Sequence, residues 1–574
     1  MAEAIDDANS QDGNDLSRIF GKVRAIIKLE NLPPLAARVR SRMTGKPVED
    51  YLTNCHTNPN PIYGSSNILF EIEFSDKVCW LLKVPSNGYP GGFSEHSAKE
   101  LRAEVLTMRL IKRETTVPIP EVFEFNNSCD NEVCCPFILM EYIKGKALQH
   151  VWFDQTVDVE ILEKRRRRAL SDVAKAMIQL DKFTFSQGGM ILFDEDDKVD
   201  GVGPIRTVDL QSTMNRQQED GDSDGGSSDN SDIVYDVGPM VDMKSWFTSE
   251  LEKRQRPSDA SGQGLYNFMD FCIDLAVSEC QSALNEEERN APQFVLAHPD
   301  FDIQNMIVSE TDGSLQALID WDGPISVPRY MLGNESYPGW LTRDWDELMY
   351  GYEENSTPGP DNPNNWENSP SELAHYRRVY QDIIEDLTKS QSIRRRTART
   401  LALHNLSIAA DNFMNTRPIM SKIFDEIAKI TAKAEQSSKP YETASEDDAS
   451  TDVVLNEKEE GKEILKEIYK ETQKEIYKET HNYTGKEISK ELCKKIYKEI
   501  HYSPKKSEEK QGEENYEVEE DQEVKKNPED KGIDDSFIEY VVFTNWAEGK
   551  LSDNHKERLV RGFKALLSGI EGMD

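Results

Sequence analysis

Two groups of polar side chains lie within the otherwise apolar stretch VLAHPDFDIQNMIVSETDGSLQALIDWD at residues 295–322. The first group follows the apolar run 294–297, and the second follows the apolar run 315–319. In chain order the residues are His298, Asp300, Asp302, Asn305, Asp320 and Asp322. Carboxylate and amide oxygens suit a hard cation that carries phosphate oxygens, because Mg²⁺ prefers oxygen ligands and takes few of them from protein. One carboxylate would remain to accept a proton from an attacking hydroxyl, which is the chemistry of phosphoryl transfer.

A turn between the two groups predicts how the chain brings them together. Thr311-Asp312-Gly313 is a turn signal of the kind that joins two short strands. The stretch is therefore expected to form a loop, a hairpin and a second loop. This arrangement would place Asp300, Asn305 and Asp320 at neighbouring strand ends.

The order of these residues resembles a known family. HPDFDIQN at 298–305, followed by IDWD at 319–322, is similar to the aminoglycoside phosphotransferase (choline kinase-like) family. The similarity is greatest to its fungal branch, which reads HxDxxxxN and then IDWD or IDWE. The resemblance implies a protein kinase-like fold that moves the γ-phosphate of ATP onto a small-molecule hydroxyl. It makes Asp300 the catalytic base and makes Asn305 and Asp320 ligands of Mg²⁺, so the implied cofactors are ATP and Mg²⁺.

Asp302 departs from the family pattern. Many members read HGDLHPGN, with histidine two places after the catalytic aspartate, and protein kinases have lysine there. A carboxylate at this place cannot neutralise phosphate, so either the metal compensates for it or the activity differs.

An earlier segment supplies a candidate phosphate clamp. Residues 67–74 and 78–84 read as two strands about a short turn, which predicts a hairpin. Lys83 ends the second strand, where a lysine either reaches water at an edge or is held by a charged partner. The expected partner is Glu104, on a helix predicted over 97–113. By resemblance, this is the Lys–Glu pair that holds the α- and β-phosphates of ATP.

Gly64, Ser65, Ser66 and Asn67 directly precede the hairpin, where a kinase-like fold covers the nucleotide phosphates. Backbone N–H groups of a Gly/Ser turn can reach phosphate oxygens because no bulky Cβ intervenes. The residues alone fit a plain turn equally well, since GxGxxG is absent. The resemblance suits a relaxed G-x-x-N loop.

Two further segments resemble small-lobe elements of the family. TTVPIPEV at 115–122 is similar to its TxVPxPxV connector, and PFILMEYIKG at 136–145 is similar to its last small-lobe strand and hinge. By that resemblance, adenine would bond to the backbone between Glu141 and Ile143. The residues alone fit an ordinary strand that ends at Gly145.

Together these segments predict an α+β, two-lobed protein kinase-like fold. A leader and N-terminal helix are expected over 1–50, a β-rich small lobe over 51–142, and a mainly helical large lobe over 143–435. The helix expected over 18–42 is predicted to break at Pro33-Pro34 and to pack outside the small lobe. Large-lobe helices are expected over 162–182, 242–253, 265–284, 371–387 and 394–434.

Three segments differ from this globular pattern. The Asp/Ser/Gly-rich tract at about 216–232 cannot bury enough apolar surface and predicts a disordered insertion. Residues 436–534 read as an acidic, disordered segment that contains a Glu/Lys repeat at 462–501. Glu and Lys three and four residues apart favour a single charged helix, whereas a coiled coil needs a steadier apolar seam. A stripe that binds a protein partner is the other interpretation of the repeat. Residues 535–574 resemble the family's C-terminal helical cap.

The composition limits the partners and the location. The 574 residues carry a net charge of −38, which argues against nucleic acid, whose phosphates reward the opposite sign. No apolar run approaches the roughly 20 residues that span a bilayer, so no membrane partner is expected. The N-terminus MAEAIDDANSQDGNDL is acidic and polar, unlike a signal or transit peptide. A cytoplasmic location is expected, with the nucleus as the alternative.

The expected function is therefore ATP-dependent transfer of the γ-phosphate to a hydroxyl of a small molecule. The alternatives are a nucleotide-binding scaffold whose catalysis is impaired and an interaction protein that acts through residues 462–501. A protein kinase is disfavoured because the HRDxKxxN, DFG and APE set is not present. No residue pattern selects the acceptor, since an amino alcohol and a sugar fit equally.

Overall fold

The structure is a computed structural model that describes residues 12–221, 233–354, 366–437, 542–547 and 549–569. The described chain forms two compact units. The first contains the residues up to Lys253 together with Ala276–Phe413, and the second contains Arg254–Leu275 and the residues from Met414 onward. Every residue predicted for the active site lies in the first unit.

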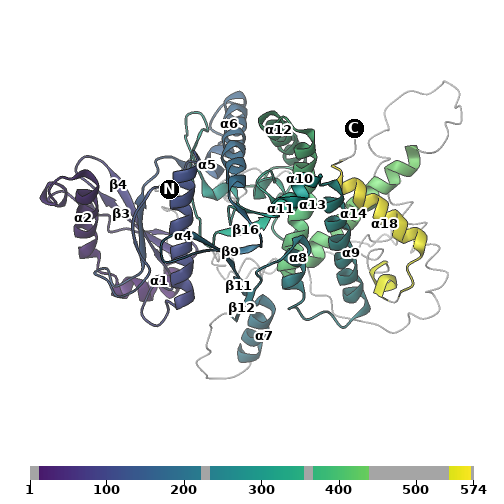
Figure 1. The fold of residues 1–574 in the computed structure, drawn as a ribbon, viewed down its shortest axis with the longest axis horizontal. Helices are drawn as coiled ribbons and strands as arrows, with labels where there is room; N and C mark the ends of the chain where they lie inside the picture. The colour runs from purple at the N-terminus through teal and green to yellow at the C-terminus, as the bar shows by residue number, and fades with distance from the viewer. Residues whose placement is uncertain (1–11, 222–232, 355–365, 438–541, 548, 570–574) are drawn as a thin grey trace, which may run out of the picture. The chain divides into compact units, whose positions relative to one another are not determined.

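One antiparallel sheet forms the small lobe of the first unit (Figure 1). Its strand order is β1-β3-β4-β6-β5, and β2 pairs with β3 outside this path. The predicted hairpin is confirmed, because β3 and β4 pair from Asn67 opposite Pro85 to Glu73 opposite Cys79. The strands are β1 (His56–Thr57), β2 (Ile62–Tyr63), β3 (Asn67–Glu73), β4 (Cys79–Pro85), β5 (Val122–Asn126) and β6 (Phe137–Glu141).

Alternation along β4 sends its side chains to two different layers. Trp80, Leu82 and Val84 join the core that α1 (Asp12–Ile26) and α2 (Leu32–Thr44) also line. Lys83 points to the opposite face, because successive side chains of a strand alternate. That face meets α4 (Glu95–Glu114), and Figure 1 shows β3 and β4 between α2 and α4. The sheet thus aims Lys83 at α4.

A helix break was predicted at Pro33-Pro34, but the break does not lie at these prolines. α1 ends at Ile26, and Pro33 and Pro34 occupy the first turn of α2. Proline is tolerated there because first-turn N–H groups have no partner within the helix. The break lies just before the prolines, where the 3₁₀ turn Leu29–Asn31 separates the two helices.

The rest of the first unit is mainly helical. It also contains short strands, which the loops of the predicted site connect. One sheet has the order β10-β9-β16-β13-β8, and a smaller one has the order β15-β14-β7. The hairpin predicted around Thr311-Asp312-Gly313 is confirmed by the antiparallel pairing of β14 with β15. The strands are β7 (Lys146–Ala147), β8 (Thr184–Phe185), β9 (Gly189–Phe193), β10 (Val199–Gly203), β13 (Phe294–Ala297), β14 (Met306–Val308), β15 (Leu315–Leu318) and β16 (Ile325–Pro328).

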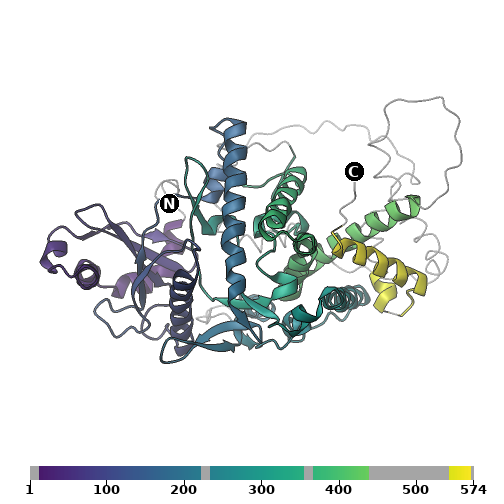
Figure 2. The same cartoon turned by 45° about the horizontal axis from the view of Figure 1, so that its top comes forward.

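Long helices support these strands. Figures 1 and 2 show α6 beside α12, and the Tyr376 hydroxyl on α12 donates to Glu163 on α6 at 2.7 Å. The ring of Trp152, at the end of α5 (Leu148–Trp152), packs edge-to-face against the ring of Tyr376. The helices are α5 (Leu148–Trp152), α6 (Val159–Ile178), α8 (Met243–Leu251), α12 (Pro370–Thr388) and α13 (Gln391–Asp411). The α+β, two-lobed prediction is thereby confirmed.

The second unit contains α14 (Phe413–Ser437) from Met414 onward, α18 (Asp553–Leu567), and the part of α9 (Ala260–Ala283) up to Leu275. Its core is aromatic: the ring of Phe268 lies 5.9 Å from Phe424 and 5.5 Å from Phe543. Because α14 packs in this unit, the unit boundary falls at Phe413, before the predicted end of the large lobe at residue 435.

Three further predictions differ from the structure or lie beyond it. The single helix expected over 394–434 is two helices, α13 and α14, because Asn412 has extended backbone angles. The insertion expected at 216–232 begins later, since α7 (Leu210–Gly221) is helical and Asp209 accepts the Ser212 N–H at its start. Residues 222–232 and 438–541, including the repeat at 462–501, lie outside the described residues. Within the described residues, no helix is both long enough and apolar enough to cross a membrane.

Candidate active site

His298 joins the two loops that carry the predicted catalytic residues. β13 ends at Ala297, and the buried His298 ring places Nε2 2.9 Å from the carbonyl oxygen of Ile319. The Asp300 N–H donates to the other ring nitrogen, Nδ1, at 3.2 Å. Nε2 must therefore carry the proton, and burial lowers the pKa of His298 to about 4. A neutral imidazole thus fixes the backbone of the first loop against the second.

Asp300 and Asn305, the predicted base and metal ligand, lie in direct contact. The Asn305 amide nitrogen donates to the Asp300 carboxylate at 2.7 Å and to its backbone oxygen at 3.0 Å. Gln304 also donates to the carboxylate, at 3.2 Å. Burial, with the nearby Asp302 carboxylate, raises the pKa of Asp300. The amide nitrogen of Asn305 is engaged, so its oxygen is the atom left to face a cation.

Asp320 follows β15 in a strained backbone conformation. Its φ is +66°, in the left-handed region that non-glycine residues seldom adopt. The preceding N–H, of Ile319, donates to the Asn305 carbonyl at 2.9 Å, so this loop also is tied to the first. Burial raises the pKa of Asp320; Asp322 and Asp300 add to this effect, and Lys83 opposes it.

Lys83 is the point where the small lobe meets the second loop. Its ammonium nitrogen lies 2.7 Å from Glu104 Oε1, 2.5 Å from Asp322 Oδ1 and 3.7 Å from Asp320 Oδ1. Burial alone would lower the pKa of Lys83, but these carboxylates outweigh it and raise the pKa. Burial and the neighbouring Asp322 raise the pKa of Glu104, whereas Lys83 overcomes burial and holds the pKa of Asp322 well below its usual range.

The Gly/Ser turn lies next to this ion cluster. The Gly64 N–H donates to the Asn67 carbonyl at 2.8 Å, and the Ser86 N–H donates to the Ser66 carbonyl at 2.8 Å. Gly64, Ser65 and Ser66 are exposed, as a loop that contacts a ligand must be. The Asn67 amide donates to Asp322 at 2.7 Å. The turn, Lys83 and the second loop are therefore brought together.

The N–H groups of the first two hinge residues, Glu141 and Tyr142, are already bonded within the small lobe. The Glu141 N–H donates to the Glu121 carbonyl at 2.9 Å, and the Tyr142 N–H donates to the Cys79 carbonyl at 3.3 Å. These two donors are used within the sheet, because β6 lies between β4 and β5 and is paired on both sides. These two hydrogen bonds leave the Glu141 carbonyl and the Ile143 backbone unaccounted for, so adenine bonding between Glu141 and Ile143 stays a prediction.

Asp302, the departure from the family pattern, is paired with a cation. Arg343 donates to its Oδ2 at 2.6 Å, and the Ile303 N–H donates to its Oδ1 at 2.6 Å. Arg343 also lies 3.3 Å from Glu367 Oε1. The negative charge of the loop at this place is therefore compensated from a segment 41 residues further along the chain.

Sequence reasoning did not assign roles to Asp322 and Arg343. A signal for Asp322 was available, because the family pattern IDWD or IDWE retains a carboxylate at that position. No sequence signal pointed to Arg343, because its contact with Asp302 depends on the path of the intervening chain and follows no spacing rule.

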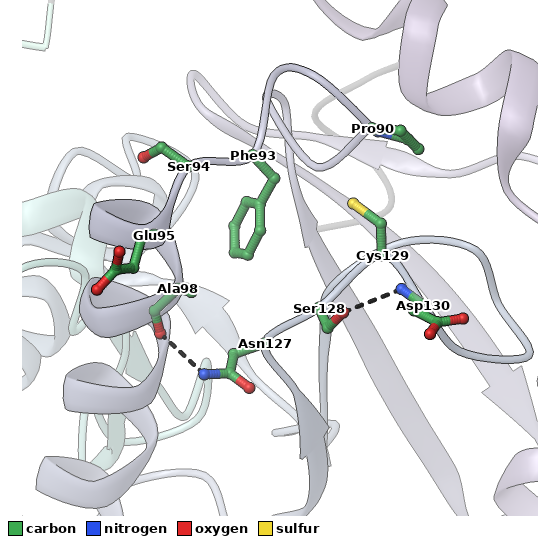
Figure 3. Close-up of a pocket in the computed structure, with 9 residues that line it drawn as sticks. All are labelled: Pro90, Phe93, Ser94, Glu95, Ala98, Asn127, Ser128, Cys129 and Asp130. Carbon is green, nitrogen blue, oxygen red and sulfur yellow. Dashed lines mark hydrogen bonds between the residues drawn. The ribbon is translucent and has the colours of Figure 1, made fainter.

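A hollow of about 580 Å³ lies elsewhere on the small lobe (Figure 3). The N-terminal end of α4 and the loop after β5 line it, with Phe93 facing inward between Ala98 and Cys129. The Asn127 amide donates to the Ala98 carbonyl across its floor at 3.3 Å. None of its lining residues belongs to the predicted active site.

The loops around Lys83 fit a hard divalent cation. Asp320 and the free oxygen of Asn305 are oxygen donors, and Asp300 and Asp322 lie close to them. Burial and mutual repulsion raise the pKa of Asp320, and a cation among these carboxylates would relieve that repulsion. The donor chemistry therefore suits Mg²⁺.

The chain is similar to curated relatives that carry the name altered inheritance of mitochondria protein 9, mitochondrial. It is 27% identical to the Candida albicans protein over 159 residues, which are 28% of this chain and 23% of the relative. It is 23% identical to the Kluyveromyces lactis protein over 327 residues, 51% of this chain and 52% of the relative. The chain thus spans about half the length of these relatives, or less. Their mitochondrial names contradict the predicted cytoplasmic or nuclear location.

Similarity also extends to solved structures and to a family description. A macrolide 2′-phosphotransferase from Brachybacterium faecium matches 69% of this chain and 96% of its own, at 11% identity and a TM-score of 0.30. The sequence model of the phosphotransferase enzyme family matches residues 64–323. This range begins at the Gly/Ser turn, ends just after Asp322, and includes Lys83, Glu104 and Asp300. Residues 64–323 of this chain are therefore similar to the phosphotransferase enzyme family.

Proposed function

We propose that this protein is an ATP-dependent phosphotransferase that transfers the γ-phosphate to a hydroxyl of a small molecule. One observation carries the proposal. A buried lysine on a small-lobe strand, Lys83, lies against Glu104 and against the loop that carries Asp320, while Asp300 and Asn305 are in contact on the adjoining loop. These side chains come from separate stretches of the chain, and all fall within the family match.

Each residue has a defined role in this proposal. Lys83, positioned by Glu104, binds the α- and β-phosphates, and the turn from Gly64 to Asn67 covers the phosphates. Adenine bonds to the hinge backbone between Glu141 and Ile143. Asn305 and Asp320 hold Mg²⁺, which neutralises charge on the phosphates when it is bound.

Asp300 orients the acceptor hydroxyl and takes its proton. A bond forms between the acceptor oxygen and the γ-phosphorus, the bond from that phosphorus to the bridging oxygen breaks, and ADP leaves. Positioning and charge neutralisation supply most of the rate, because the protein forms no covalent intermediate. Asp302 departs from the family pattern, but Arg343 neutralises its carboxylate. This pair therefore supports an active enzyme over a scaffold with impaired catalysis.

The test is a turnover screen with the full-length protein. Mg·ATP is offered with a panel of hydroxyl-bearing metabolites, and ADP release is measured alongside the phosphorylated product. With an accepted substrate, Asp300→Ala should lose about 10²–10⁴ in rate and should retain the thermal shift caused by nucleotide. Asp196→Ala removes an exposed carboxylate, 78% accessible, and serves as the matched control.

Two results would overturn the proposal. Equal turnover by wild type and Asp300→Ala would remove the base from the mechanism. A nucleotide-dependent thermal shift with no transfer to any acceptor would select the nucleotide-binding scaffold instead. In that case deletion of residues 462–501 should abolish function in cells while nucleotide binding persists.

We further propose a mitochondrial location, supported by the names of the similar relatives. A full-length protein tagged at its C-terminus should co-fractionate with mitochondrial markers and resist protease in intact organelles. Recovery in the soluble cell fraction would contradict this proposal.

A further inference from the structure

The catalytic loop lacks a cation of its own, and Arg343 lies where one is needed. The Asp302 side chain uses both carboxylate oxygens: one accepts the Ile303 N–H and the other accepts Arg343 Nη2, each at 2.6 Å. The other terminal nitrogen of Arg343, Nη1, lies 3.3 Å from Glu367. One guanidinium therefore serves two carboxylates, one on the loop and one just before α12.

This ion pair is not an ordinary surface contact. The side chains of Asp302, Arg343 and Glu367 are 19%, 23% and 12% exposed. Exposed ion pairs contribute little because water and salt screen them. Removing one partner of a largely buried pair has a much larger effect, because the other charge is left uncompensated.

The backbone that carries Arg343 is fixed to the catalytic loop. The Gly339 N–H donates to the Phe301 carbonyl at 2.8 Å. A Cβ at Gly339 would lie 3.2 Å from that carbonyl oxygen and 3.4 Å from the Asp302 carboxylate, so the two segments pack closely.

Two short 3₁₀ turns, Gly339–Leu341 and Arg343–Trp345, follow this contact and are held from the other side. Arg377 of α12 donates to the Leu341 carbonyl at 2.9 Å and to both oxygens of Asp344, at 2.8 and 3.1 Å. This arginine and Asp344 are almost fully buried. Arg343 is therefore set in position by its neighbours on both sides.

The carboxylates around the catalytic loop make the position of the Arg343 guanidinium important for the charge balance of the site. Asp300, Asp320 and Asp322 lie nearby, and the ammonium of Lys83 is already shared by Glu104, Asp320 and Asp322. A nucleotide would add further negative charge. Without Arg343, the carboxylates of Asp302 and Glu367 would both lose a cationic partner beside the loop.

We propose that Arg343 is a positioning residue for phosphoryl transfer, acting through Asp302 to neutralise and immobilise the catalytic loop at residues 298–305. Its guanidinium supplies, from a distant part of the sequence, the positive charge that this loop lacks two places after Asp300. This inference rests on the proposed function for its kinetic consequence, and its structural consequence can be measured without turnover.

The kinetic test compares four full-length variants with wild type and with one control variant. Arg343→Gln should lower kcat by about 10- to 100-fold, as expected for a displaced catalytic group, and should change the KM for ATP by less than threefold. Arg343→Lys should recover part of the loss. Asp302→Asn should be mild. Asp302→Asn combined with Arg343→Gln should be faster than Arg343→Gln alone, because the uncompensated charge on the catalytic loop is gone while that of Glu367 remains. Arg206→Gln, which removes a partly exposed pair with Asp236, is the control and should leave kcat unchanged.

The structural test is hydrogen exchange on the nucleotide-free protein. Arg343→Gln should accelerate exchange in peptides covering 298–305, while peptides from β3 and β4 stay as protected as in wild type. Unchanged exchange in 298–305 would overturn the proposal, and so would a double variant no faster than Arg343→Gln. If wild type transfers phosphate to no acceptor but Arg343→Gln still loosens 298–305, the proposed function fails and the positioning role stands.

Discussion

The ammonium of Lys83 lies 2.5 Å from Asp322 Oδ1, and the amide of Asn67 donates to the other oxygen of the same carboxylate at 2.7 Å. Both donors are residues that we propose contact nucleotide phosphates. Without nucleotide, the Asp322 carboxylate therefore engages groups that a phosphate would use. Nucleotide binding must replace or rearrange these two hydrogen bonds.

Asp322→Asn should raise the affinity for ADP in the absence of divalent metal. The substitution removes a negative charge that competes with the phosphates for Lys83 and repels them directly. We expect a gain of several-fold to about tenfold, or up to about 1.4 kcal/mol. Isothermal titration calorimetry in the presence of EDTA would measure it. Asp312→Asn, in the exposed hairpin turn, is the control, and weaker ADP binding by Asp322→Asn would contradict the competition.

Lys83→Met should destabilise the first unit. The substitution leaves Glu104 buried beside Asp322 without their shared cation, and breaking a buried pair in this way costs about 3–5 kcal/mol. Lys83→Met combined with Glu104→Gln should be more stable than Lys83→Met alone, because one uncompensated charge is removed. Denaturant unfolding followed by near-ultraviolet circular dichroism measures both.

The control for this pair is Lys77→Met, which removes an ammonium that is 83% exposed and pairs with Glu73. It should change the unfolding free energy by less than about 1 kcal/mol. Equal stability of wild type and Lys83→Met would show that the ion cluster is not a buried, coupled site.

Local patterns predicted the framework of the site. Strand alternation and a short turn predicted the β3–β4 hairpin, and the resemblance to the family predicted that Lys83 and Glu104 form a pair. Thr311-Asp312-Gly313 predicted the hairpin that separates the two loops. The two hairpin predictions depend on residues close in sequence, where steric and hydrogen-bonding preferences act directly.

Contacts between distant segments could not be predicted in this way. Asp322 meets Lys83 across 239 residues and Asn67 across 255, and Arg343 meets Asp302 from the start of the 3₁₀ turn Arg343–Trp345, 41 residues further along the chain. The position of these side chains depends on packing of the whole first unit. The break at Asn412 in the helix expected over 394–434 is not explained by Pro418 either, because that proline lies beyond the break, inside α14.

The stability of the first unit should fall as pH rises from about 4.5 to 7, through Glu335. This carboxyl is buried beside Asp181, with Arg396 Nε 3.3 Å away, next to a cavity of about 280 Å³. Burial, with Asp181 adding, raises the pKa of Glu335 to about 7, above its ordinary value of 4.5. The folded state thus binds the proton more tightly than the unfolded state, so the stabilisation is complete below pH 4.5 and is lost as pH rises through 7.

Measuring the free energy of unfolding at several pH values tests whether stability falls as pH rises. Glu335→Gln should remove the part of the decrease that Glu335 causes, at most about 3 kcal/mol over the interval, and leave the part due to Glu367, whose pKa burial also raises to about 7. Glu287→Gln, an exposed carboxyl that lines the same cavity, should leave the decrease intact. A Glu335→Gln variant with the same slope as wild type would contradict the assignment.

Gly313→Ala should destabilise the hairpin that separates the two catalytic loops. Gly313 has a φ of +72°, and a Cβ there would lie 2.4 Å from the Arg165 carbonyl oxygen, a backbone atom of α6 that cannot move aside easily. Left-handed backbone in a non-glycine residue costs of order 1–3 kcal/mol, and the steric clash adds to it. Gly21→Ala is the matched control, because no atom lies within 4 Å of its Cβ position in α1 and alanine favours a helix by about 1 kcal/mol. Denaturant midpoints should therefore shift in opposite directions for the two variants.

Gly313→Ala should also speed hydrogen exchange at both ends of the hairpin, since β14 follows Asn305 and β15 precedes Asp320. An unchanged midpoint and exchange pattern would show that the turn does not position these residues.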